Sequence, residues 1–392
     1  METAVILYHM LVLAGLLLAL AATLVNVASF GGLRPAAPPP PEDAPLVSIL
    51  VPARNEARNI EACVGSLLMQ DYPHYELIVL DDHSDDGTGE IVRRLGLGDS
   101  GNRRVISGEP LPVGWTGKSW ACHQLSLAAR GDYLFFTDAD TTHAPGTLSA
   151  VVAAACAYRA DLLSAWPRLI TKTPGEKLVI PMILLLGMVM YPHWLVLLLQ
   201  MYPNVAARLP TAARRMLGAA NGQFIFFTRA AYERIGGHAA LRDHLVEDVA
   251  LGRAVAARMG EGMRLLNCES LRFSTCRMYR SFPEVWEGFT KNMRAAFENS
   301  LAGFLGIGAM QVCGFLLPFV FVFVPGPARP LVIMQVGVIY LIRIVLTLRF
   351  RTSWTGCLLH PLGEALALAI GLNSWRRLAT KGVTWKGRTY QS

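Results

Sequence analysis

Pairs of carboxylates follow two apolar runs of the sequence and have the spacing to hold a phosphorylated ligand. Asp138-Ala139-Asp140 follows the run Tyr133–Thr137, and Asp81-Asp82 follows Glu76–Leu80 at the start of the acidic turn Asp81–Thr88. One carboxylate can accept hydrogen bonds from a ribose while another binds a divalent cation that also contacts a diphosphate. A structural alternative is that Asp, Ser and Gly simply favour turns and helix starts. The position of both pairs directly after apolar runs favours the binding role.

A later acidic pair, Glu247-Asp248, could supply a general base. The pair lies between the turn Gly236-Gly237 and a predicted amphipathic helix, so it could merely compensate the positive end of the helix dipole. Transfer of a group to a hydroxyl needs a carboxylate that takes the hydroxyl proton. No other acid late in the chain fits that role as well.

Lys118 lies in Gly114–Trp120, whose Gly-Lys-Ser resembles part of a phosphate-binding loop. Position 112 is Pro, where the Walker pattern requires Gly, so the ATPase class is excluded. A lysine that opens a helix can still contact a phosphate or a base, or it can be solvated at the surface. The sequence leaves both alternatives open.

Two arginines stand at the start of a predicted amphipathic helix. Arg277 and Arg280 precede a stretch with three aromatic residues and Lys291, a pattern typical of a helix that lies in the membrane interface. The arginines could also neutralise a leaving diphosphate. Both roles are compatible.

The elements that must position these residues are short strands alternating with helices. Leu46–Val51, Glu76–Leu80 and Tyr133–Thr137 are aliphatic or β-branched runs, and an amphipathic stretch separates the first two. This alternation predicts a doubly wound α/β domain. Ligands of such domains bind beyond the carboxyl ends of the strands, which adds Pro52 to Glu56 to the candidate site.

Composition indicates a chain that is partly soluble and partly in a membrane. Of the 392 residues, 53% are hydrophobic, and the net charge is +7. Because the Lys and Arg residues gather beside apolar segments, anionic lipid headgroups are a better partner than nucleic acid, which we do not expect to bind. The seven cysteines lack metal-site spacing, so we expect free thiols.

The apolar segments predict the following division of the chain. We expect a transmembrane anchor at 1–33, a Pro-rich tether at 34–45, an α/β domain at 46–300 with a re-entrant or interfacial insertion at 178–200, and at 301–392 a transmembrane hairpin, a re-entrant segment and a basic tail. The insertion cannot cross the membrane once, because the acids of the candidate site lie on both sides of it in the sequence.

Four motifs in this order resemble the family 2 glycosyltransferases, which have a GT-A fold. They are Pro52–Glu56, Asp81–Thr88, Asp138–Asp140 and Glu247-Asp248. Gly114–Trp120, Arg277–Arg280 and the tail Trp385–Arg388 are similar to membrane-bound members associated with carotenoids and hopanoids. Those membrane synthases that make polysaccharides carry Trp where this chain has Ser281, which argues against a processive synthase.

The resemblance implies roles for individual residues. Pro52, Glu56 and Asp82 would border the base, Asp138 the ribose and Asp140 the metal, with Asp248 as the base catalyst. The rest of the predicted donor site is Ala53, Asn55, Asp81, Asp85 and Lys118, and the rest of the predicted catalytic set is Glu247, Arg277 and Arg280.

The expected function is therefore an inverting, Mg²⁺- or Mn²⁺-dependent transfer of a sugar. The donor would be a nucleotide diphosphate sugar, and the acceptor a hydroxylated carotenoid, hopanoid or other glycolipid precursor. We expect a multi-pass protein of the cell (inner) membrane with its catalytic domain on the cytoplasmic face. Alternatives are transfer to polyprenyl phosphate, whose ionised oxygen needs no base, and a non-catalytic nucleotide-sugar-binding scaffold. A transporter is disfavoured because the apolar segments are few.

Overall fold

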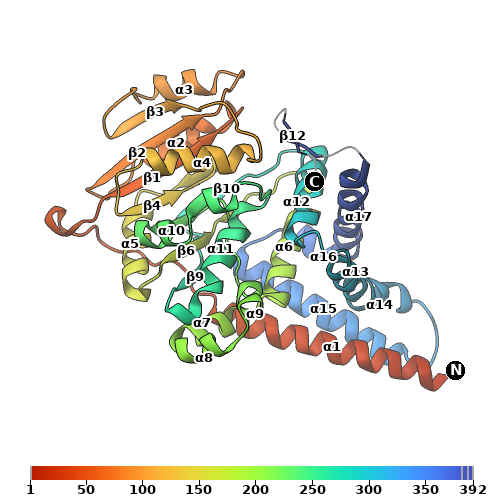
Figure 1. Ribbon diagram of the computed structural model, residues 1–392. Helices are drawn as coiled ribbons and strands as arrows, with labels where there is room; N and C mark the ends of the chain where they lie inside the picture. The colour runs from red at the N-terminus through yellow and green to blue at the C-terminus, as the bar shows by residue number, and fades with distance from the viewer. Residues whose placement is uncertain (1, 381–382, 386–387, 391–392) are drawn as a thin grey trace. The chain divides into compact units, whose positions relative to one another are not determined.

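The computed structural model describes residues 2–380, 383–385 and 388–390, so the predicted tail at Trp385–Arg388 lies partly outside the described residues. The chain forms two compact units. The sheet unit comprises Phe30–Ile170 and Leu195–Met278, and the helical unit comprises Met1–Ser29, Thr171–Trp194 and Tyr279–Ser392 (Figure 1). The domain limits expected from the sequence stay a prediction.

A seven-stranded sheet forms the centre of the sheet unit. Its strands lie in the order β3 (Arg103–Ser107), β2 (Tyr75–Asp81), β1 (Val47–Ala53), β4 (Tyr133–Phe136), β8 (Ile225–Thr228), β6 (Leu162–Trp166) and β9 (Leu265–Glu269). β1 pairs in parallel with β2 and β4, whereas β8 is antiparallel to both of its neighbours. The carboxyl ends of β1, β2 and β4 therefore lie at one edge, which confirms the predicted α/β architecture.

Helices cover both faces of this sheet. They are α2 (Ile60–Leu68), α3 (Thr88–Arg94), α4 (Gly117–Ala128), α5 (Thr147–Tyr158), α10 (Arg229–Arg234) and α11 (Glu247–Ala257). Two further helices, α8 (Pro203–Arg208) and α9 (Thr211–Met216), pack on the turn Met259–Glu261 and on α11. The central strands are buried on both faces, which explains their continuous aliphatic runs. A second sheet has the strand order β5 (Thr141–His143), β10 (Ser274–Cys276) and β7 (Arg168–Leu169).

β3, at one edge of the sheet, carries two arginines and is not among the three strands that the sequence predicts. Arg104 Nη1 lies 2.8 Å from Oε2 of Glu76, a fully buried carboxylate on β2 that also accepts a 2.6 Å hydrogen bond from Ser48 Oγ. Burial opposes ionisation of Glu76, but the bonds from Ser48, Arg130 and Arg104 lower its pKa. Arg104 therefore pairs with the buried carboxylate of Glu76 within the sheet.

The helical unit contains the long apolar helices. Its elements are α1 (Glu2–Ser29), α6 (Pro174–Met190), α12 (Phe282–Ala296), α13 (Leu301–Met310), the π-helical turn η4 (Gln311–Leu316), α14 (Leu317–Phe321), α15 (Arg329–Phe350), α16 (Trp354–Leu358), α17 (His360–Thr380), β11 (Val383–Trp385) and β12 (Arg388–Tyr390). α7 (His193–Met201) begins in this unit and continues in the sheet unit.

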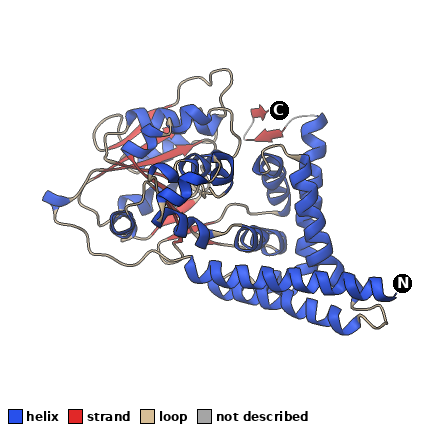
Figure 2. Ribbon diagram, turned by 60° about the horizontal axis from the view of Figure 1, so that its bottom comes forward, coloured by secondary structure: helices blue, strands red, loops and turns tan. Residues whose placement is uncertain are grey.

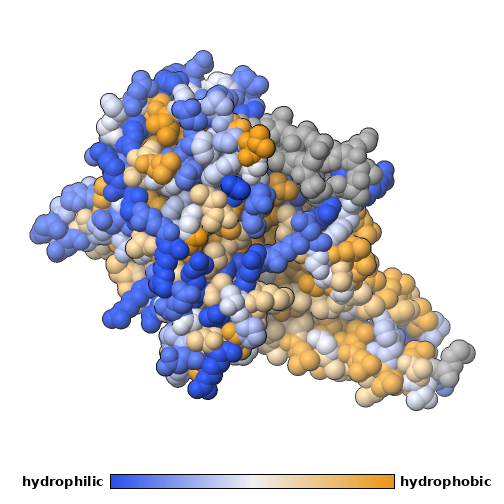
Figure 3. Space-filling model, in the orientation of Figure 1, coloured by the Kyte–Doolittle hydropathy of each residue, from blue (hydrophilic) through white to orange (hydrophobic). Residues whose placement is uncertain are grey.

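Three helical segments of the described chain are long and apolar enough to cross a membrane. They are Glu2–Ser29, Leu301–Phe321 and Arg329–Phe350, and α6 with α7 would add a fourth if this bent pair counts as one span. α1 and α15 lie side by side, and Gln335 Nε2 of α15 donates a 2.7 Å hydrogen bond to His9 O of α1 (Figure 2). The outer side of α1 is an exposed hydrophobic surface (Figure 3).

The prolines that the sequence suggests as helix breakers have different positions in the helices. The segment 178–200 is a pair of helices with its break at Tyr191-Pro192, whereas Pro181 stays inside α6. Pro361 is the second residue of α17, where its missing N–H removes no helical hydrogen bond. It therefore begins this helix instead of interrupting it.

Candidate active site

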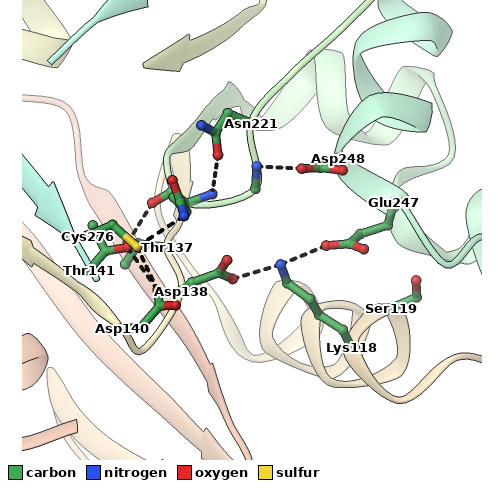
Figure 4. A network of polar contacts seen from close by, with 12 residues as sticks. Lys118, Ser119, Thr137, Asp138, Asp140, Thr141, Asn221, Glu247, Asp248 and Cys276 are labelled. Atoms are coloured by element: carbon green, nitrogen blue, oxygen red, sulfur yellow. Dashed lines mark hydrogen bonds and ion pairs between the residues drawn. The ribbon is translucent and has the colours of Figure 1, made fainter. Parts of the chain in front are cut away.

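Lys118 connects the two acidic motifs that the sequence singles out. Its ammonium lies 2.7 Å from Asp138 Oδ1 and 2.8 Å from Glu247 Oε1. Figure 4 shows the lysine between the loop after β4 and the start of α11. The sequence left open whether this lysine contacts a ligand site or is solvated at the surface. Because its ammonium pairs with two acids and its side chain is only 38% exposed, the structure places it within the candidate site.

The start of α4 positions this lysine. Thr116 caps the helix by accepting a hydrogen bond from Ser119 N, and its own N–H donates a 2.7 Å bond to Arg242 O. The segment before α4 is thus tied to the segment that leads to Glu247. These two hydrogen bonds of Thr116 fix the first turn of α4, which carries Lys118, beside the acids.

The acids Glu247 and Asp248 have different environments although they are adjacent. Burial opposes ionisation of Glu247, but its contact with Lys118 lowers its pKa. Burial and the neighbouring Glu247 raise the pKa of Asp248 to about 6. Gly222 N donates a 2.7 Å hydrogen bond to Asp248 Oδ2, which fixes this carboxylate. A fixed carboxylate with a pKa near neutrality suits a general base.

Asp140 lies beside β10 and near two other acids, Asp138 and Glu56. Cys276 Sγ lies 3.4 Å from Asp140 Oδ1, and Thr141 Oγ1 lies 3.2 Å from the same oxygen. Burial, Asp138 and Glu56 raise the pKa of Asp140 to about 7. A cation bound there would relieve the repulsion among these carboxylates.

The donor atoms fit Mg²⁺ or Mn²⁺, which prefer oxygen ligands. No three His, Cys, Asp or Glu side chains in the described part of the chain are grouped as a complete metal site. Such ions commonly take one or two protein carboxylates and complete their shell with substrate phosphates and water. Asp140 is thus the residue that would hold a cation arriving with a diphosphate.

The loops after β1 and β2 are joined by hydrogen bonds at the predicted base-binding end. Asn55 N donates to Ser84 Oγ at 3.0 Å, and Asp85 N donates to Asn55 Oδ1 at 3.1 Å. Glu56 N donates to Thr88 Oγ1 at 2.8 Å. These bonds place Glu56 and the turn after β2 together, as the sequence predicts.

The remaining predicted donor residues lie at the strand ends. Ala53 on β1 is the register partner of Asp81 on β2, and Pro52 is the partner of Leu80. Ala53 and Asp82 are buried, whereas Pro52 and Asp81 are partly exposed. Since the Ala53 methyl group belongs to the core, only its backbone can contact a ligand.

The chain matches two family models in sequence. Residues 48–196 match the model described as Glycosyl transferase family 2, and residues 199–392 match that described as Glycosyl transferase family 21. The chain carries a family 2 glycosyltransferase domain. It also resembles 4,4'-diaponeurosporenoate glycosyltransferase of Staphylococcus aureus, with 26% identity over 360 residues that cover 88% of each chain.

The fold of this glycosyltransferase is similar to that of one solved structure. That structure is of a mannosyltransferase from Pyrobaculum calidifontis in complex with GDP-Man and Mn²⁺. It has a TM-score of 0.50 and 18% identity, and the match covers 96% of this chain and 98% of that chain. The likeness confirms the predicted GT-A fold.

The two arginines predicted to act in catalysis lie in different units. Arg277 belongs to the sheet unit and directly follows Cys276, whose thiol contacts Asp140. Arg280 belongs to the helical unit, and its backbone N–H donates a 2.8 Å hydrogen bond to Glu284 Oε2 of α12. The catalytic role of both arginines stays a prediction.

Sequence reasoning missed Asn221, Gly222 and Cys276. Asn-Gly is a typical turn dipeptide, which was the available signal for the first two. A Cβ atom on Gly222 would lie 3.0 Å from Lys118 Nζ and 3.1 Å from Asp248 Oδ2. A methyl group at this position would therefore require Lys118 or Asp248 to shift by a few tenths of an ångström.

Replacing Gly222 with Ala is expected to lower kcat about tenfold or more, because the new methyl group displaces Lys118 or the charged hydrogen bond to Asp248. Steady-state kinetics of the purified variant would measure this. Gly65→Ala is the matched control, since a Cβ there meets nothing within 4 Å. Equal activity of the two variants would contradict the prediction.

Proposed function

We propose that this glycosyltransferase moves a sugar from a nucleotide diphosphate sugar to a hydroxyl group of a carotenoid-type membrane lipid, with inversion at the anomeric carbon. The observation that carries the proposal is Asp248, a fixed carboxylate with a pKa raised to about 6 beside the Lys118 bridge. The named Staphylococcus aureus relative supports a carotenoid-type acceptor, and three candidate spans support a membrane location.

The donor half of the proposed site lies at the carboxyl ends of β1, β2 and β4. The joined loops around Glu56 and Asp82 would hold the base, Asp138 the ribose, and Asp140 a divalent cation. When bound, the cation supplies positive charge that stabilises the departing diphosphate. Lys118 orients Asp138 through its ion pair.

The acceptor half is built around Asp248. Its carboxylate takes the proton of the acceptor hydroxyl as the acceptor oxygen bonds to the anomeric carbon and the bond from that carbon to the diphosphate breaks. Attack opposite the leaving group inverts the anomeric configuration. Arg277 and Arg280 are proposed to neutralise the leaving charge.

A direct test is incubation of the full chain in lipid nanodiscs with a panel of nucleotide sugars, Mn²⁺ and carotenoid acceptors that end in hydroxyl or carboxyl groups. Mass spectrometry of the extracted lipids would identify the product. Transfer to a hydroxyl, with the opposite anomeric configuration in the product, supports the proposal. Hydrolysis of the donor without any glycosylated lipid would overturn it.

A second candidate acceptor is an ionised oxygen. The relative is named for 4,4'-diaponeurosporenoate, which is a carboxylate, and a carboxylate or polyprenyl phosphate oxygen needs no base. Both candidates use the same donor site. They differ in whether Asp248 is required for turnover.

We further propose that the chain crosses the cell (inner) membrane several times with the sheet unit on the cytoplasmic side. Basic residues flank α16 and α17, with Arg349 and Arg351 before them and Arg376 and Arg377 in the last turns of α17. Positive residues favour the cytoplasmic side of a membrane. Protease mapping that puts regions near Asp140 and Asp248 on opposite sides would contradict this topology.

The acid limb of kcat/KM is expected at about pH 6, where Asp248 loses the charge that a base needs. In Lys118→Met this limb should move to higher pH, because Lys118 lowers the pKa of both Glu247 and Asp248 and its loss lets the pair bind protons more tightly. Lys118→Arg keeps the charge and should retain the wild-type limb. Identical profiles for the Met and Arg variants would contradict the assignment.

A further inference from the structure

The sheet unit exposes apolar side chains between the end of α7 and the end of α9. Met201, Tyr202, Val205 and Met216 are between 50% and 77% exposed. Arg208 and Arg215 are exposed among them. We call these six residues the α7–α9 surface.

The segment of sequence that carries this surface has charges of one sign. The sequence has no Asp or Glu from position 177 to position 232, whereas it has arginines at 208, 214, 215 and 229. Arginines combined with exposed apolar side chains match anionic headgroups above an acyl region. Nucleic acid would use the arginines but would leave Met201, Val205 and Met216 without partners.

The chain reaches this surface directly from a membrane-compatible segment. α6 and α7 together pass the length and composition test for a broken span, and α7 ends at Met201, the first residue of the surface. α8 and α9 follow within the next fifteen residues. Continuity with an apolar segment favours a lipid surface over a soluble protein as the partner.

We propose that the α7–α9 surface docks the sheet unit on the membrane, with its apolar side chains in the interface and its arginines on anionic headgroups. The inference goes beyond the proposed function and rests only on its membrane location. It concerns a peripheral contact of the sheet unit, in addition to the candidate spans of the chain.

The buried side of the same segment is connected to the candidate base. Ala206 of α8 is fully buried, α8 packs on the turn Met259–Glu261, and α9 packs on α11 (Figure 1). A Cβ atom on Gly218 would collide with the backbone of Arg253 in α11. A Cβ atom on Gly252 of α11 would collide in the same way with Ala219.

The segment 218–222 therefore runs in backbone contact with α11. It ends at Gly222, whose N–H donates to Asp248 Oδ2 at the start of that helix. Docking through α8 and α9 would thus fix the orientation of the base relative to the membrane from which the acceptor comes. The α7–α9 surface has a positioning role and does not touch the reacting atoms.

The contact can be measured without turnover. A fluorophore on Met216→Cys, in full-length protein with Cys156→Ser and Cys313→Ser, would be tested in nanodiscs of phosphatidylglycerol and phosphatidylcholine. We expect quenching by nitroxide-labelled lipid and protection from iodide. Met69→Cys is the matched control, because Met69 is 68% exposed on the same unit and outside the surface. Its label should be quenched by iodide alone.

Charge dependence identifies the lipid. Arg208→Gln with Arg215→Gln should weaken docking roughly 25-fold on phosphatidylglycerol nanodiscs, from the typical contribution of two basic residues at an anionic surface. Arg94→Gln, an exposed arginine on α3, should leave docking unchanged. Lipid quenching at Met216 should also fall when phosphatidylcholine replaces the anionic lipid.

Three results would overturn the proposal. The Met216 label could be quenched by iodide as strongly as the Met69 label, which would mean an aqueous surface. It could be protected from iodide without any quenching by lipid, which would mean that a protein or a second copy covers it. Docking could also be independent of lipid charge. None of these outcomes depends on sugar transfer, so they are distinguishable from failure of the proposed function.

Discussion

Replacing Asp248 with Asn is expected to lower kcat for transfer to a hydroxyl acceptor by about 10²- to 10⁴-fold, the usual range for loss of a general base. The amide has nearly the same size, and its oxygen can still accept the hydrogen bond from Gly222 N. It cannot take a proton at neutral pH. Donor affinity should therefore stay close to that of the wild type.

The stability of this variant separates a catalytic effect from a folding effect. The pKa of Asp248 in the fold is about 6, above its ordinary value of 3.8. The folded state therefore binds the proton more tightly than the unfolded state, and stability is lost as the pH rises from about 4 to about 6. At pH 7 the neutral amide should give a melting temperature no lower than that of the wild type.

Asp243→Asn is the matched control for this experiment. Asp243 lies on the same approach to α11, but its side chain is 75% exposed. Its substitution should leave kcat unchanged. Equal loss of donor binding in Asp248→Asn, or a normal kcat with a hydroxyl acceptor, would contradict the role of base.

The acceptor class can be read from the same variant. If the wild type glycosylates only the carboxylate or phosphate acceptor and Asp248→Asn keeps that rate, the nucleophile is already ionised and the second candidate function holds. If the wild type glycosylates the hydroxyl acceptor and Asp248→Asn loses this transfer while it still binds the donor, the first holds. The variant is therefore most informative when it is assayed with both kinds of acceptor.

The sequence alone is sufficient to predict those parts of the candidate site that lie at the ends of strands. β1, β2 and β4 are buried on both faces, so each appears as an aliphatic run that stops where polar residues begin. Parallel pairing then brings Glu56, Asp82 and Asp138 to one edge. Periodicity and element order alone predict this grouping.

Contacts between distant segments could not be predicted in the same way. Lys118 contacts Glu247, and Cys276 contacts Asp140, although more than 120 positions separate the partners in each pair. Lysine and cysteine have no local pattern that distinguishes these contacts from solvation or core packing. Only the tertiary fold decides which acid faces the ammonium and which carboxylate keeps a raised pKa.

Replacing Asp140 with Asn is expected to lower kcat about 10³-fold, because a carboxylate ligand for the cation that stabilises the departing diphosphate is lost. The wild-type enzyme should likewise lose turnover in excess chelator and regain it with Mn²⁺ or Mg²⁺. Electron paramagnetic resonance of Mn²⁺ with nucleoside diphosphate would measure ion binding independently of turnover. We expect the bound signal in the wild type and its loss in Asp140→Asn.

The direction of the stability change distinguishes this role from a structural one. Asp140 shares its surroundings with Asp138 and Glu56, which raise its pKa to about 7. Because these like charges repel, the uncharged Asn should leave the metal-free protein at least as stable as the wild type. Asp99→Asn, at an exposed loop, is the control for removal of one negative charge. Full turnover in chelator, or an unchanged Mn²⁺ signal in Asp140→Asn, would refute the metal role of this residue and leave Lys118 and the arginines to neutralise the diphosphate.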